Sequence, residues 1–101
     1  MICFQTLFFL ILITTETKVI TGKNTDTIID RINEASEQAY GILLNITSNI
    51  SGLKAANAIK GAIKNRKNIE NIYVNIRGQG FYFDRRQVLG KTMIDRLSKI
   101  K

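Results

Sequence analysis

The chain has 101 residues, of which 15 are Lys or Arg and 8 are Asp or Glu, so its formal net charge is +7. It contains no histidine and one cysteine, Cys3. Without histidine, the chain lacks the commonest zinc ligand and the commonest general base. A single cysteine cannot form a disulfide within the chain. A chain of this length accommodates one small domain that folds without these staples.

The N-terminal segment Met1–Ile13 is almost entirely apolar, and a polar run follows it at once. This apolar length suits the hydrophobic region of a signal peptide, because spanning a bilayer takes about 20 apolar residues. Thr15 and Gly22 are small residues that offer cleavage points. We therefore expect a signal peptide at residues 1–22 and a secreted, extracellular, disulfide-free domain at 23–101. An uncleaved membrane anchor is the alternative.

The first part of the expected domain, residues 23–52, predicts an acidic helix. Thr27 and Asp30 have the spacing of a capping box. Apolar residues then recur at steps of three and four, which indicates a buried helical stripe: Ile29, Ile32, Ala39, Leu43, Ile46, Ile50 and Leu53. Residues 45–52 are rich in residues that favour turns. A break there, giving a helical hairpin over residues 26–66, and one continuous helix both remain open.

The second part, residues 53–101, predicts a helix, a β-hairpin and a helix. Leu53–Arg66 is amphipathic with helical spacing. Ile69–Ile76 and Phe81–Phe83 are rich in β-branched and aromatic residues and flank a glycine-containing turn, the pattern of a hairpin near residues 69–84. Gln87–Ile100 returns to helical spacing. The predicted fold class is therefore mainly α, in the order helix, helix, hairpin, helix.

Charge is distributed unequally along the chain. Residues 23–52 carry a net charge of −2, whereas residues 53–101 carry +9. A basic surface of this kind favours anionic partners. The residues that we expect to bind an anionic surface lie mainly opposite apolar helical stripes, and they are Lys54, Lys60, Lys64, Lys67, Arg85, Arg86, Lys91, Arg96 and Lys99. In a membrane-active protein the stripes around Ile59, Ile63, Leu89, Met93 and Leu97 would then insert into lipid.

Two short motifs concern modification. Asn45-Ile46-Thr47 and Asn49-Ile50-Ser51 both satisfy the acceptor pattern for N-glycosylation. On an exported eukaryotic chain they predict a glycoprotein. Because Asn45 would project away from the predicted helical stripe, the helical interpretation favours Asn45 over Asn49 as the acceptor.

The segment Arg77–Phe83 partly matches a pattern in which strand aromatics stack on RNA bases. Gln79 and Asp84 occupy positions where that pattern has aromatics, and two strands follow each other directly. Together with the expected export, this mismatch does not favour nucleic acid as a partner. The interpretation retained for the segment is a hairpin with an aromatic core.

No catalytic constellation is present in the sequence. The carboxylates are scattered, and no hydroxyl nucleophile sits in a recognisable motif. We therefore expect no enzyme, no cofactor and no metal. The expected function is a small secreted cationic protein that binds an anionic membrane or glycan surface. The alternative is a secreted ligand or secretion-fluid component, of the seminal or salivary type, that acts through one extracellular protein partner.

Overall fold

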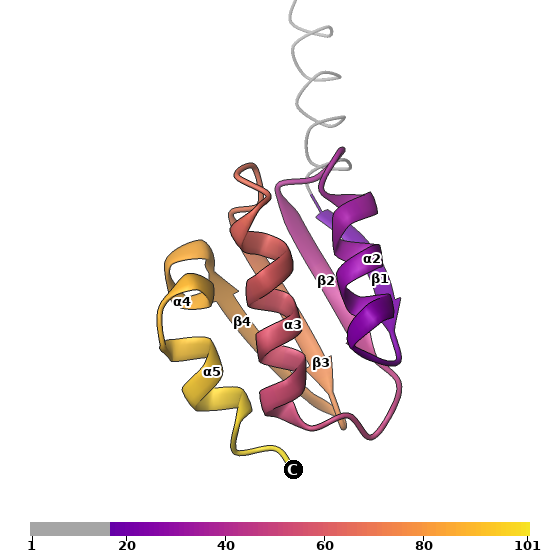
Figure 1. The fold of residues 1–101 in the computed structure, drawn as a ribbon, viewed down its shortest axis with the longest axis vertical. Helices are drawn as coiled ribbons and strands as arrows, with labels where there is room; N and C mark the ends of the chain where they lie inside the picture. Colours follow the sequence, from indigo (N-terminus) through magenta and orange to yellow (C-terminus); the bar gives the residue numbers. More distant parts are fainter. Residues whose placement is uncertain (1–16) are drawn as a thin grey trace, which may run out of the picture.

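A computed structural model describes residues 17–101 of the chain. These residues form an α/β fold in two layers, with one four-stranded sheet and helices on one of its faces (Figure 1). The prediction of a mainly α fold is therefore wrong. The apolar segment at residues 1–13, which predicts the signal peptide, lies outside the described residues.

The strands follow one another across the sheet in chain order. β1 (Thr17–Gly22), β2 (Gly41–Ile46) and β3 (Asn71–Ile76) are parallel, and β4 (Gln79–Asp84) is antiparallel to β3. β1 and β4 are thus the edge strands. The six residues of β1, which the sequence assigns to the end of the signal peptide, pair residue by residue with β2.

The one-sided helical layer follows from the strand order. α2 (Thr25–Ala35) connects β1 to β2, and α3 (Gly52–Lys64) connects β2 to β3. Crossovers between parallel strands are right-handed in nearly all proteins, so a sheet that grows in one direction places both helices on the same face. α4 (Arg85–Leu89) and α5 (Thr92–Leu97) follow β4 and contact α3 in that same layer (Figure 1).

The main correction concerns residues 26–53, where one apolar stripe predicted helix. The helix ends at Ala35, and Gly41–Ile46 is the second strand of the sheet. In β2 the buried apolar side chains are Ile42, Leu44 and Ile46, which alternate with period two. Neither the continuous helix nor the helical hairpin is formed. The predicted capping box is also displaced, because the Asn24 side chain accepts from Thr27 N and caps α2.

The later elements agree better with prediction. α3 confirms the predicted helix over 53–66, and β3 and β4 confirm the hairpin near 69–84. The helix predicted over 87–100 divides into α4 and α5 at Gly90 and Lys91. Asp84 caps α4 and thereby begins that helix directly at the end of β4.

The core lies between the sheet and the helices. It is built mainly from isoleucine and alanine, and its largest fully buried side chain is Phe83 of β4. The alanines of α3 are buried, and Ala55 and Ala56 have no exposed surface. Small side chains on a central helix allow close approach to the strands beneath it. The basic residues of α3 are thereby held on the outside of the layer.

The other face of the sheet is not covered by helices in residues 17–101 (Figure 1). One row of residues in register crosses this open face, and it consists of Val19, Leu43, Tyr73 and Tyr82. Tyr73 is 43% exposed and Tyr82 is 56% exposed. The next row toward the hairpin turn is polar, with Thr21, Asn45 and Asn75.

Candidate anion-binding site

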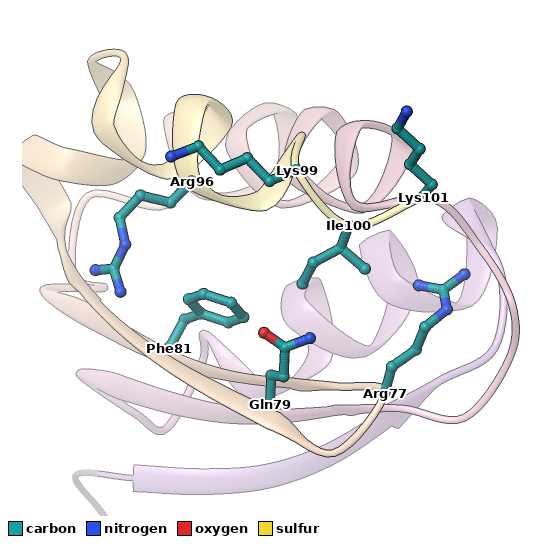
Figure 2. A pocket seen from close by; sticks show the side chains of 7 residues that line it. All are labelled: Arg77, Gln79, Phe81, Arg96, Lys99, Ile100 and Lys101. Atoms are coloured by element: carbon teal, nitrogen blue, oxygen red, sulfur yellow. The ribbon is translucent and has the colours of Figure 1, made fainter.

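A cationic groove lies where the β3–β4 hairpin faces the C-terminal segment. The groove has a volume of about 400 Å³. Figure 2 shows its lining, which comes from the hairpin on one side and from α5 and the last residues on the other: Arg77, Gln79, Phe81, Arg96, Lys99, Ile100 and Lys101. Four of these seven residues are basic and none is acidic. The Arg77 and Arg96 side chains lie at its two ends, whereas the Lys101 amine points away from the cavity (Figure 2). Basic residues without an acidic partner in the lining make the local potential positive.

Arg96 of α5 is held in place by aromatic rings. Its guanidinium carbon lies 5.2 Å from the centroid of the Phe81 ring and 5.3 Å from that of Phe83. The two rings stack with centroids 6.1 Å apart. A guanidinium over ring faces is attracted by their quadrupole and loses little freedom when it later binds a ligand. The two rings therefore hold the Arg96 guanidinium in a defined position at the groove.

The C-terminal segment owes its position to a close backbone contact. Gly52, at the start of α3, donates its N–H to the Ile100 carbonyl oxygen over 2.8 Å. A Cβ at residue 52 would overlap the Leu97 carbonyl oxygen, so only glycine lets the two backbones approach this closely. This contact fixes the side of the groove that carries Lys99 and Lys101.

The structure separates most of the basic residues that the sequence grouped together. Arg96 and Lys99 line the groove. The other seven lie on α3, on the loop after it, on α4 or between α4 and α5: Lys54, Lys60, Lys64, Lys67, Arg85, Arg86 and Lys91. The groove-lining residues Arg77 and Lys101 were not among the predicted anion-binding residues. Lys101 has no sequence signal beyond its charge, whereas Arg77 begins the segment Arg77–Phe83 that partly matches the RNA-binding pattern. Their meeting was not predicted, because the groove joins segments distant in the chain.

Two of the predicted anion-binding residues, Arg85 and Lys60, form hydrogen bonds with backbone carbonyl oxygens. The Arg85 guanidinium donates to the carbonyl oxygens of Arg66 and Ile69 over 2.8 and 2.9 Å. It thus ties α4 to the turn after α3. Lys60 Nζ lies 3.4 Å from the Gly90 carbonyl oxygen and links α3 to the end of α4.

The apolar stripes expected to insert into lipid are occupied by the core. Ile59 and Ile63 of α3 and Met93 and Leu97 of α5 have no exposed surface. Leu89 is half-buried against the same core. In the folded protein Ile59, Ile63, Met93 and Leu97 are therefore not available to insert into a bilayer.

A second, polar pocket lies at the carboxyl ends of the parallel strands. Its volume is about 530 Å³, and Arg77 is its one charged lining residue; the others are Thr21, Asn45, Ile46, Thr47, Ser48, Asn49, Asn75 and Gly78. The pocket adjoins the cationic groove, because Arg77 lines both.

The acceptor asparagines of both glycosylation motifs, Asn45 and Asn49, line this polar pocket. Asn45 is half-buried on β2, and its Oδ1 accepts from Asn75 Nδ2 over 3.3 Å. Asn49 is exposed in the loop between β2 and α3. The hydroxyl of Ser51 in the second motif caps α3 by accepting from Lys54 N. The folded structure therefore presents Asn49 more openly than Asn45.

On the open face, Tyr73 and Tyr82 are exposed aromatic neighbours. They are direct partners on β3 and β4. The Tyr73 ring reaches across Gly80, since a Cβ there would lie 2.8 Å from Tyr73 Cζ and overlap its hydroxyl. Gly80 thus allows the Tyr73 ring to lie toward the hairpin turn that carries Arg77.

Within residues 17–101, no helix is long and apolar enough to cross a membrane. The same residues hold no group of three or more His, Cys, Asp or Glu side chains that could ligate a metal ion. Comparison of the chain with protein-family models, curated proteins and solved structures gave no match.

Proposed function

We propose that this protein is a non-enzymatic binding protein for anionic polymers, and that single-stranded nucleic acid is the polymer its surface suits best. The proposal keeps the anionic partner that the charge distribution predicts. It replaces the membrane and glycan surfaces named from sequence, and it departs from the expectation that disfavoured nucleic acid.

The observation that carries the proposal is that β4 separates an exposed tyrosine pair, Tyr73 and Tyr82 on the open face of the sheet, from a cationic groove on the helix-covered side. Proteins that bind single strands combine a positive channel for the phosphates with aromatic side chains on which bases stack. Here the β3–β4 hairpin supplies both tyrosines and one side of the groove. β4 directs Phe81 toward the groove and Tyr82 toward the open face.

The same features argue against the other anionic partners. Lipid insertion requires apolar faces that the core already occupies. Sulfated glycans present charge but no planar π system, so they would contact the tyrosine pair only through the C–H groups of their sugar rings. Stacking on tyrosine contributes about 1–3 kcal/mol per base, which a glycan or a headgroup does not supply.

Export remains a separate proposal that rests on the N-terminal residues alone. The surface described above would bind a polyanion in any compartment. One structural consequence is definite: cleavage at Gly22 would remove all of β1, whereas cleavage at Thr15 would leave it intact. We therefore propose that any cleavage occurs before Thr17.

The test is binding of the full chain to a labelled 20-nucleotide oligothymidylate, followed by fluorescence anisotropy. The chain has three tyrosines and no tryptophan, so its intrinsic emission reports on tyrosine. We expect saturable binding, quenching of tyrosine emission, and an affinity that falls with salt as counterions are released. Absence of binding at low salt refutes the proposal.

Variants separate stacking from charge. Tyr73→Leu and Tyr82→Leu should each weaken binding by about 1–3 kcal/mol, because each removes one stacking surface. Tyr40→Leu, at an exposed tyrosine outside the row, is the matched control. Heparin and vesicles that contain phosphatidylserine are the comparison ligands. If either binds as tightly as the oligonucleotide, and the row variants bind like the control, the protein is a general polyanion binder and the nucleic-acid assignment is wrong.

A further inference from the structure

The turn between β3 and β4 has an unusual residue at its first central position. The two central residues are Arg77 and Gly78, with φ values of 49° and 76°. A two-residue hairpin turn with both φ values positive is the type in which Asn-Gly and Gly-Gly predominate. Arginine in this left-handed conformation has a Cβ that crowds its own backbone. The turn is therefore less stable than the same turn with asparagine.

Arg77 is also the residue that the groove and the polar pocket share. It lines the cationic groove with Arg96, and it lines the polar pocket with Asn75. Figure 2 shows the Arg77 side chain rising from the hairpin at the end of the groove opposite Arg96. One of its terminal nitrogens donates to the Asn49 carbonyl oxygen over 2.7 Å. A guanidinium has five N–H donors, so this single bond leaves the planar fork able to bind an anion.

We infer that Arg77 is the phosphate contact at which a bound strand passes from the cationic groove into the polar pocket, and that this contact is the reason for the strained turn. The inference rests on the proposed function and adds a ligand path and a specific contact to it. Backbone strain concentrates at binding sites, where it is retained for function at the expense of stability. Arginine is suited to the task because it binds phosphate with two parallel hydrogen bonds.

The inference predicts that Arg77→Asn keeps or raises the stability of the protein and lowers its affinity for the oligonucleotide. Arg77→Asn relieves the turn and removes the cation. Its melting temperature should equal that of the wild type or exceed it by up to about 8 °C. Its affinity for the 20-nucleotide oligothymidylate should fall about tenfold, the effect of losing one charge-assisted contact of about 1.4 kcal/mol.

The salt dependence of binding identifies the contact as one to phosphate. On single strands each phosphate contact contributes about 0.7 to the slope of log affinity against log salt, so Arg77→Asn should reduce the slope by about that amount. Arg77→Lys keeps the charge and should keep the slope. Arg31→Asn is the control: it removes the same charge from α2, where Arg31 pairs with Glu34 at the exposed surface. This control should leave the affinity and slope unchanged.

The outcomes are distinct. If the wild-type protein does not bind the oligonucleotide, the proposed function fails and the inference with it. If the wild type binds but Arg77→Asn binds equally well with the same slope, the proposed function stands and the inference is overturned. If Arg77→Asn melts well below the wild type, Arg77 serves to clamp the turn to the loop at Asn49, and the inference is again overturned.

Discussion

The contact between Gly52 and the C-terminal segment provides a direct test of how the groove is built. Gly52 is buried at the first position of α3 and donates to the Ile100 carbonyl oxygen. In Gly52→Ala, the new Cβ would overlap the Leu97 carbonyl oxygen and would lie 2.7 Å from the Leu97 carbonyl carbon. Ordinary carbon–carbon contacts are about 3.5–4.0 Å, so the segment must retreat by about 1 Å.

The loss in free energy of unfolding depends on the packing of the groups that move. Leu97 is fully buried and Ile100 is 8% exposed, so both lose packing when the segment retreats. Overpacking of this kind costs about 1–3 kcal/mol, and the Gly52–Ile100 hydrogen bond contributes about 1 kcal/mol more. We expect Gly52→Ala to reduce the free energy of unfolding by about 2–4 kcal/mol. For a domain of this size the melting temperature would fall by about 10–25 °C.

The assay is thermal and urea unfolding followed by circular dichroism, with Gly61→Ala as the matched control. Gly61 lies on the same helix with nothing within 4 Å of an added Cβ. Its replacement should stabilise the protein by about 0.5–1 kcal/mol through helix propensity. Gly52→Ala should also bind the oligonucleotide more weakly, because Lys99 and Lys101 move with the segment. A Gly52→Ala protein as stable as the wild type would refute the reasoning.

Three further predictions concern the open face, the edge strand and the polar pocket. Gly80→Ala should displace the Tyr73 ring and weaken oligonucleotide binding several-fold without changing its salt slope, which titrations at several salt concentrations would measure. A chain that lacks β1 should fail to show a cooperative melt, because β2 would lose its hydrogen-bonded partner strand and Leu44 would lose its neighbour Ile20. A chain that begins at the first residue of β1 should melt normally. If the protein is produced in a eukaryotic secretory pathway, mass spectrometry should find sugar on Asn49 before Asn45, and sugar confined to Asn45 would contradict the structural argument.

The helices and the hairpin show what local sequence can predict. α3 was predicted because its apolar residues recur with helical period over more than three turns. The hairpin was predicted because strand-forming residues flank a glycine-containing turn, which is local chemistry. Each pattern is formed by residues that are close to one another in the chain. No distant contact is needed to recognise them.

β2 shows why the fold class was not predicted. Leu43 and Ile46 continue the three-and-four spacing from α2, while Ile42, Leu44 and Ile46 alternate with period two. A short apolar run supports both interpretations, and only pairing with β1 and β3 decides between them. β1 was missed for a related reason. Its short alternating pattern directly follows a longer apolar segment and was assigned to that segment.

The proposed binding site likewise combines features set by local sequence with features set by the tertiary structure. The sequence by itself determined the charge of residues 53–101, the absence of histidine, the amphipathic α3 and the turn at Arg77 and Gly78. These are properties of composition and of neighbours in the chain. The tertiary structure alone decided which cations meet. Arg77 faces Arg96 and Lys99 because the C-terminal segment folds back onto Gly52, and the tyrosine pair is exposed because both crossover helices cover the opposite face of the sheet.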